Sequence, residues 1–265
     1  MIQNYVSLRA SDHRYFDTDM REYMSVSKFL SHFDEKFDAK KWAKLSAGKG
    51  KYEGLSADEV EVLWRDGGKD ATDHGTRIHG ALEEYSKTAS IDPSNKDLEP
   101  MVKSIISQYK DYHTSYDEVC VYYPFEAPVD GYWGIAGTMD KALIVSSRSK
   151  YFDVEDYKTN IKNGIVYNNK YNKYLFAPVS HLQSCNYNKY SLQIGMYGLM
   201  YEGLTGFKMR AGAIRYIPAE DPLLHTRIAV PYLKTDCQNM IKHFQNTPIE
   251  LKVSANVDAV ETPNF

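Results

Sequence analysis

Two consecutive hydrophobic segments decide the fold: WGIAGTMDKALIV occupies residues 133–145, and KYFDVEDYK occupies residues 150–158. Both are rich in β-branched and aromatic residues, and the turn-forming sequence SSRSK lies between them. This pattern predicts two neighbouring antiparallel strands. The segment VCVYYPFEA, at residues 119–127, predicts a third strand just before them.

The chain before this sheet, residues 1–116, is predicted to be mainly helical. Hydrophobic residues recur there at the spacing of amphipathic helices. Ser56 followed by Glu59 fits a capping box at the start of a helix, and Gly67 and Gly68 are predicted to end that helix. The predicted helices cover residues 25–45 (two short helices), 56–66, 71–86 and 97–116.

Residues 117–250 are predicted to hold the core sheet and its covering helices. Residues 159–188 show no clear period, and their length suggests a loop or small lobe inserted into that core. Later segments predict two strands, in AGAIRYIP and LHTRIAV, and two helices, over residues 190–203 and 235–246. Residues 251–265 are predicted to be a mobile tail. The element order predicts an α/β fold, a mixed central β-sheet flanked by helices, in one domain with the helical N-terminal region.

Composition places the chain among ordinary folded proteins. Hydrophobic residues make up 43% and charged residues 25%, which argues against wholesale disorder. The net charge of −3 argues against a protein that coats nucleic acid without selectivity, because such binding needs many lysine and arginine contacts to phosphates. Lysines nevertheless cluster over residues 36–51 and 158–173. Either cluster could be a basic track for nucleic acid or simply a solvated charged surface.

Tyrosine is frequent, with 22 residues, and many tyrosines stand beside Asn and Lys over residues 165–190. Aromatic rings interleaved with lysines could stack on unpaired bases while the lysines follow the backbone. An AT-rich coding genome would enrich the same residue types everywhere, and composition does not separate the two explanations.

The sequence also indicates a compartment. The N-terminus lacks the basic start and apolar run of a secretory signal, and no stretch approaches the ~20 apolar residues that span a bilayer. Cys120, Cys185 and Cys237 form no CxxC pair, so neither a disulfide framework nor a zinc or iron–sulfur site is indicated. We therefore expect no membrane association and a reducing cytoplasm, the host cytoplasm if the source is viral.

Charged residues of the two central strands form a candidate catalytic group. Asp156 and Lys158 are two positions apart on a strand, so their side chains project from one face. Asp140 lies on the neighbouring strand, and an antiparallel pair can bring carboxylates within metal-sharing distance. Two aspartates and the carbonyl of Tyr157 supply the oxygen ligands that Mg²⁺ and Mn²⁺ prefer. Taken alone, Asp-x-Lys is also the pattern of an exposed ion pair on many strands.

Four short motifs follow one another along the chain: GTRIHGALEEY, GTMD, DVEDYKT and QIGMY. Together they resemble the PD-(D/E)XK nucleases, and within them the RecB-like branch of phage-encoded and CRISPR-associated-type exonucleases. The resemblance covers residues 25–201 and implies a restriction-endonuclease-like core. The stretch LFAPVSHLQSCNYNKYSLQIGMY also looks like phage-encoded members of the superfamily.

The resemblance implies a set of site residues. Glu83, one turn after His79, is a candidate to support the residues that bind the metal. Read without the resemblance, His79 could be a hydrogen-bonded core histidine, and Gln193 with Tyr197 the polar edge of a packed helix. In the RecB-like branch, the resemblance places the metal-binding histidine at His79, the two acids at Asp140 and Asp156, and the lysine at Lys158. The QxxxY motif of the branch, which helps to hold substrate, falls on Gln193 and Tyr197.

The predicted function is hydrolysis of DNA phosphodiester bonds with Mg²⁺ or Mn²⁺, in which Asp140, Asp156 and Lys158 are catalytic. The resemblance implies an exonuclease that acts on single-stranded ends in phage or in DNA repair and recombination, with phage recombination or replication proteins as partners. An iron–sulfur cluster is not expected, because the cysteines lack the required pairs. Two alternatives stay open: a duplex-end recombination exonuclease, and a DNA-binding recombination accessory protein without turnover.

Overall fold

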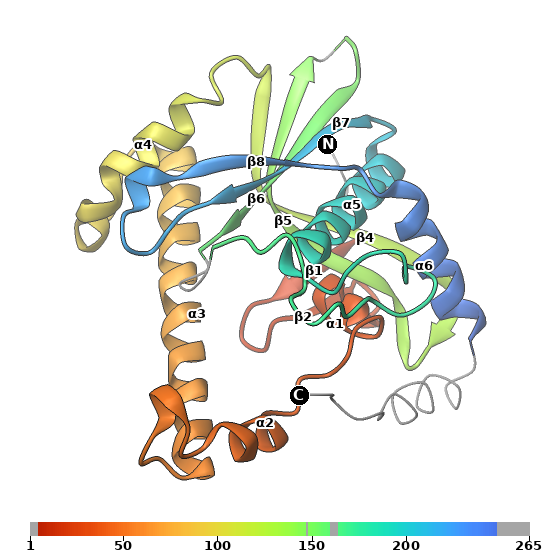
Figure 1. The fold of residues 1–265 in the computed structure, drawn as a ribbon. Coiled ribbons are helices and arrows are strands. Elements are labelled where there is room, and N and C mark those ends of the chain that lie inside the picture. The colour runs from red at the N-terminus through yellow and green to blue at the C-terminus, as the bar shows by residue number, and fades with distance from the viewer. Residues whose placement is uncertain (1–4, 147, 160–163, 248–265) are drawn as a thin grey trace.

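An eight-stranded sheet runs through the computed structural model, which describes residues 5–146, 148–159 and 164–247 (Figure 1). The strand order is β1-β2-β3-β5-β6-β7-β8, and β4 pairs with β5 off this path. Parallel and antiparallel neighbours both occur, so the predicted mixed sheet is confirmed. The strands are β1 (Val6–Arg9), β2 (Arg14–Asp17), β3 (Glu22–Ser25), β4 (Thr114–Val129), β5 (Tyr132–Ser146), β6 (Tyr151–Lys158), β7 (Lys208–Tyr216) and β8 (Thr226–Val230).

The two edges of β5 are used differently. On one edge, β4 pairs with it antiparallel over most of its length. The other edge is shared, because β3 pairs with it in parallel at Ile135 and Ala136, and β6 pairs with it antiparallel at residues 141–146. Within the described residues, no strand pairs with residues 137–140 along this second edge. The central strand therefore has a short open edge between two neighbours.

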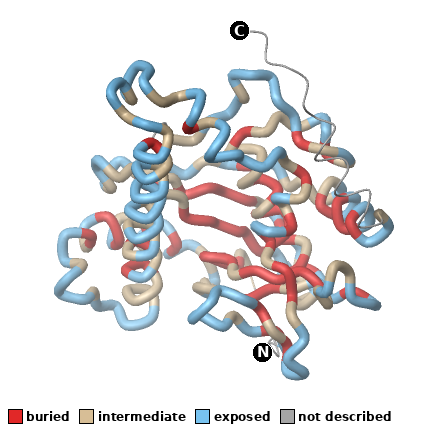
Figure 2. The backbone as a smooth tube through the Cα atoms, turned by 90° about the horizontal axis from the view of Figure 1, so that it is seen from below, coloured by how far each residue is buried: buried red, intermediate tan, exposed pale blue. Residues whose placement is uncertain are grey.

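Helices cover both faces of the sheet. On one face, α5 packs with α1 and α6 around a core that includes Phe29, Phe152 and Phe244. On the other face, α3 and α4 pack against Leu143 and Tyr157. Figure 2 shows buried positions concentrated along the strands at the centre. The helices are α1 (Val26–Ser31), α2 (Ala39–Ser46), α3 (Ala57–Thr88), α4 (Glu99–Ser107), α5 (Asn186–Thr205) and α6 (Lys234–Asn246), with 3₁₀ turns η1 (Gly50–Tyr52), η2 (Pro93–Leu98) and η3 (Pro222–Leu224).

The largest departure from the predicted helices is α3, which runs without interruption from Ala57 to Thr88. The sequence predicts two helices separated at Gly67 and Gly68. Each glycine in a helix costs about 1 kcal/mol relative to alanine, but neither adopts a positive φ here, and a helix that is already nucleated propagates through them. The predicted capping box of Ser56 and Glu59 is present at its start.

The N-terminal region, predicted to be mainly helical, also holds three strands that the sequence does not predict. These strands, β1, β2 and β3, extend the sheet. Each of these strands has four residues, which is too short to produce a recognisable alternation. The predicted helix over residues 97–116 ends at Ser107, and β4 already begins at Thr114.

The remaining predicted elements are confirmed. The three central strands, the two late strands and the helices α5 and α6 lie where the pattern predicts them. Residues 164–185 hold no helix or strand apart from an isolated bridge between Tyr174 and Gln183. Residues 251–265, predicted as a tail, lie outside the described residues. None of the described helices is long and apolar enough to cross a membrane.

Candidate metal centre

The candidate site lies where β6 leaves the edge of β5. The ladder between these strands ends with Lys141 opposite Glu155. Beyond that pair, β6 stays paired with β7 as far as Lys158 opposite Tyr216. Asp140 therefore stands at the end of the open edge of β5, next to the last residues of β6.

Asp140 is held by a backbone donor and by an imidazole. Its Oδ2 accepts a hydrogen bond from the backbone N–H of Tyr157 at 2.6 Å, in place of a ladder bond between the strands. Its Oδ1 lies 3.3 Å from Nδ1 of His79, which comes from α3. The N–H and C=O of one strand residue point to the same edge, so the carbonyl of Tyr157 also faces this opening. The side chain of His79 keeps 29% of its surface exposed, which leaves the group accessible to solvent.

Asp156 and Lys158 form a buried ion pair beside this opening. Nζ of Lys158 lies 2.5 Å from Oδ2 of Asp156 and 4.8 Å from the ring centroid of Tyr190 in α5. The ammonium group of Lys158 therefore partners this buried oxygen of Asp156. An ionised carboxylate has about four lone-pair sites, so Asp156 keeps capacity for a cation beside this pair.

Glu118 of β4 completes the group, although it lies outside all four sequence motifs. Ligand atoms of His79, Glu118 and Asp140 lie within 4.8 Å of one another. Glu118 adopts φ 50°, a left-handed conformation that non-glycine residues rarely adopt and that clusters at functional sites. The sequence feature that could have identified Glu118 as a site residue is its position one residue before the predicted strand at residues 119–127. Glu83, one turn after His79, adds negative charge near Glu118.

Burial and charge displace the pKa values of the group. Burial raises the pKa of Glu118 to about 7 and that of Asp156 to about 6, and the Asp140 carboxylate adds to both increases. Burial alone would lower the pKa of His79, but the Asp140 carboxylate outweighs it, so this pKa lies above its ordinary value. Burial would raise the pKa of Asp140, but the charge of His79 holds that pKa below its ordinary value. Burial and the neighbouring carboxylates thus oppose ionisation of Glu118 and Asp156, and a bound cation would favour their ionised forms.

The donor set fits a hard divalent cation. Carboxylates and a backbone carbonyl are the oxygen ligands that Mg²⁺ and Mn²⁺ prefer, and an imidazole is compatible with Mn²⁺. Asp156 lies outside the group of three that gathers within 4.8 Å, but its charge acts on His79 and Asp140.

Gln193 and Tyr197 lie on one face of α5, as their spacing predicts. Nε2 of Gln193 donates to the hydroxyl of Tyr197 at 2.8 Å. Tyr197 is buried against Gly137 in the open edge of β5, where an added Cβ would come within 2.6 Å of its Cε1 atom. Glycine at position 137 therefore allows α5 to cover this part of β5 closely.

Fold and site together define a mixed α/β protein whose sheet opens at one edge around buried carboxylates, an imidazole and an ammonium group. Comparison with protein families and with curated proteins finds no match. Among solved structures, the protein SSO0001 shares 14% identity, with 91% of this chain and 85% of that chain covered and a TM-score of 0.33. A candidate exonuclease from Eubacterium rectale shares 15% identity, with 92% and 91% covered and a TM-score of 0.38. At these values the likeness assigns no activity to this chain, and its place in the RecB-like branch stays a prediction.

Proposed function

We propose that this protein is a metal-dependent nuclease that hydrolyses phosphodiester bonds of DNA. One observation carries the proposal: His79, Glu118 and Asp140 gather within 4.8 Å at the point where the sheet opens. The buried pair of Asp156 and Lys158 lies beside them on the next strand. Oxygen ligands can hold a metal ion that assists phosphodiester hydrolysis, and an adjacent ammonium group can stabilise the charge that develops on the phosphate.

The charge balance distinguishes this group from a structural ion-pair network. On the α4 side of β6, the buried Glu155 is paired by Arg215 at 2.6 Å and by Arg227 at 2.8 Å, so basic groups outnumber acidic ones there. At the candidate centre, three carboxylates meet one ammonium group and one imidazole. Buried charges need partners, and an excess of buried carboxylates favours a bound cation.

Each residue of the centre has a proposed role. When bound, a divalent cation such as Mg²⁺ or Mn²⁺ lowers the pKa of an attacking water and neutralises charge on the scissile phosphate. Lys158 orients the nucleophile and stabilises charge on the phosphate, while Asp156 and the ring of Tyr190 hold its ammonium group in place. The proposed ligands are His79, Glu118, Asp140, Asp156 and the carbonyl of Tyr157.

Single-stranded DNA ends are the proposed substrate, processed by an exonuclease that serves phage or DNA repair and recombination. Tyr167 and Tyr171 are 50% and 64% exposed, and such rings can stack on unpaired bases. Tyr190 connects the end of this tyrosine-rich segment to Lys158. Tyr197 is buried, so we expect it to act by positioning Gln193, which is the residue of this pair that would contact the strand.

Labelled DNA tests the proposal. The purified protein is incubated with linear single strands, circular single strands and duplexes, in Mg²⁺, Mn²⁺ or EDTA. We expect only the linear single strands to be shortened, and only with metal. Asp140→Asn and Lys158→Ala should remove cleavage, whereas the control Lys103→Ala, on the surface of α4, should cut at the native rate.

Each other outcome has a definite meaning. Cleavage of circles would identify an endonuclease, and a preference for duplexes would identify a duplex-end recombination exonuclease. Binding without cleavage in every metal would identify a DNA-binding accessory protein. Native activity of Lys158→Ala would show that this site is assigned wrongly.

A further inference from the structure

The segment around α2 is strongly basic. Residues 36–51 hold six lysines and one aspartate, although the whole chain has a net charge of −3. Lys40, Lys41 and Lys44 of α2, named here the α2 lysine cluster, are all exposed. The ion pairs found in the described part of the chain involve other lysines. The cluster therefore presents positive charge that nearby carboxylates do not neutralise.

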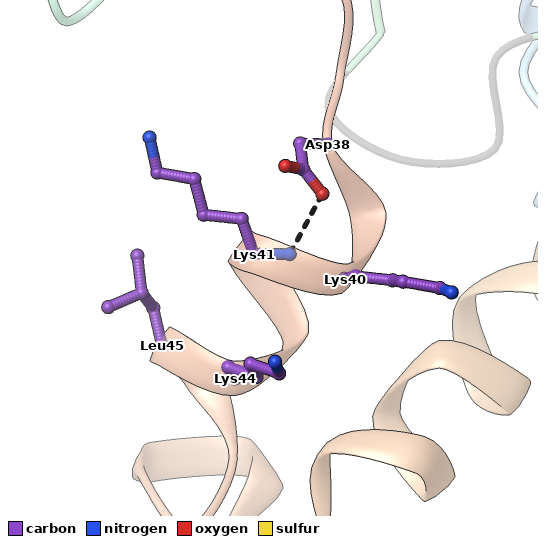
Figure 3. A pocket seen from close by; sticks show the side chains of 5 residues that line it. All are labelled: Asp38, Lys40, Lys41, Lys44 and Leu45. Carbon is purple, nitrogen blue, oxygen red and sulfur yellow. Dashed lines mark hydrogen bonds between the residues drawn. The ribbon is translucent and has the colours of Figure 1, made fainter. Parts of the chain in front are cut away.

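The aspartate of this segment is used by the helix itself. Asp38 is the N-cap of α2, and its carboxylate accepts a hydrogen bond from the backbone N–H of Lys41 at 2.9 Å (Figure 3). Figure 3 shows Lys41 and Leu45 projecting to one side of α2 and Lys40 to the other, toward a neighbouring helix. Together with Lys44 and Asp38 they line a shallow hollow. Three ammonium groups beside one carboxylate leave this surface positively charged, which suits a chain of phosphates.

The α2 segment lies on the side of α3 that faces the candidate metal centre. It docks on Trp64 of α3, whose ring centroid lies 5.7 Å from that of Phe37 and 6.0 Å from that of Tyr52. At 3.6 residues per turn, His79, the residue of α3 that belongs to the candidate metal centre, is rotated by only about 60° from Trp64 around the helix axis. Figure 1 agrees, because α2 and the sheet lie on one side of α3.

Between Trp64, where the α2 segment docks, and His79, at the candidate metal centre, part of α3 is open to solvent. Every residue from 65 to 70 is exposed, and at both glycines of this span a Cβ would meet no atom within 4 Å. The acidic residues Asp66, Asp70 and Asp73 are rotated by about 120° or more from Trp64. The side of α3 that joins α2 to His79 therefore carries no carboxylate between Trp64 and His79, and nothing on it would repel a polyanion.

We propose that the α2 lysine cluster binds the phosphate backbone of the nucleic-acid strand whose cleavable bond lies at the candidate metal centre. The proposal rests on the proposed nuclease function. Trp64 and His79 are separated by about 22 Å along the helix axis. That distance is about six phosphate steps along one strand of a duplex, and fewer along a more extended single strand. The α2 lysine cluster thus sets a minimum length for tight binding.

Charge reversal with a matched control tests this surface. The variant K40E/K41E/K44E is compared with K96E/K103E/K110E, which changes three exposed lysines near α4, and with the neutral variant K40Q/K41Q/K44Q. Circular dichroism and thermal unfolding first verify that each variant is folded. Fluorescence anisotropy in EDTA then measures binding of a labelled strand of about 24 nucleotides. Cleavage assays with metal compare this strand with one of about 3 nucleotides.

We expect K40E/K41E/K44E to bind the long strand about tenfold more weakly, and the slope of log K against log salt to fall by about 2. The glutamine variant should show a smaller loss and the α4 variant none. In cleavage, the α2 variants should raise KM for the long strand, leave kcat unchanged, and leave the short strand unaffected.

Other results would overturn the proposal. Native binding of the long strand by both α2 variants would exclude this surface, and an equal loss for short and long strands would exclude a role set by distance. If poly-glutamate of matched charge competes as well as DNA does, the surface is for an acidic protein. Loss of binding in EDTA by K40E/K41E/K44E without cleavage by the parent protein would support the surface and refute the proposed nuclease function. If the parent protein cleaves DNA but the α2 variants bind it with native affinity, the proposed nuclease function is supported and the proposed role of the α2 lysine cluster is refuted.

Discussion

Replacing Asp140 by alanine and by asparagine should separate its structural role from its chemical role. Both variants lose the negative charge, so both should lose metal-dependent cleavage. Asparagine keeps an oxygen that can accept the hydrogen bond of the Tyr157 N–H, whereas alanine leaves this buried donor without an acceptor. An unsatisfied buried donor costs about 1–3 kcal/mol. We therefore expect the free energy of unfolding of Asp140→Ala to lie about 2 kcal/mol below that of Asp140→Asn.

Unfolding experiments in EDTA measure this difference without any contribution from a bound metal. A loss of about 2 kcal/mol corresponds to a melting temperature lower by about 4–8 °C for a chain of this size. Hydrogen exchange adds a local measurement, because the amide of Tyr157 should exchange faster in Asp140→Ala than in Asp140→Asn. If the two variants have equal stability and equal protection at Tyr157, the Asp140 carboxylate does not replace a ladder bond, and our account of the open edge is wrong.

Three further predictions follow from single contacts. Glu118→Gln should weaken Mn²⁺ binding, measured by calorimetry, about tenfold, which is about 1.4 kcal/mol, and unchanged affinity would exclude Glu118 as a ligand. Gly137→Ala should destabilise the protein by about 1–3 kcal/mol, measured by urea unfolding, because the new Cβ overlaps the ring of Tyr197; native stability would show that α5 can move away at no cost. Burial would raise the pKa of Glu202, but the Lys234 ammonium group outweighs it and holds this pKa below its ordinary value. The ionised carboxylate of Glu202 therefore stabilises the fold at pH values above its ordinary pKa, and this stabilisation is lost as pH falls through the lowered pKa. The melting temperature of Glu202→Gln should accordingly lie below that of the native protein at neutral pH and approach it in acid. A difference that stays constant with pH would contradict the pairing of Glu202 with Lys234.

The strands of the core could be predicted because each has enough β-branched and aromatic residues to show its period. The spacing of Asp156 and Lys158, and the position of Asp140 on the neighbouring strand, also predict that these side chains lie close together, and the structure places them around one opening. That they perform catalysis stays a proposal.

Other features depend on tertiary structure and could not be predicted. The helix α3 passes through Gly67 and Gly68 because packing at Trp64 and beyond Gly75 holds both ends of the helix, and local propensity does not include such contacts. The three N-terminal strands are too short to show a period. Glu118 belongs to the site through an unusual backbone conformation and through its place opposite Asp140, and neither is visible in the sequence.

The shared edge of β5 has a consequence for synthesis on the ribosome. The opening at residues 137–140 is bounded by β3, which precedes β5 in the chain, and by β6, whose other neighbour β7 is translated about fifty residues later. A nascent chain that has reached only β6 has the acidic side chains but lacks the strand that supports them. Any hydrolytic activity at this centre must then wait until β7 has emerged, so an incomplete chain would be unable to damage nucleic acid near the site of its own translation.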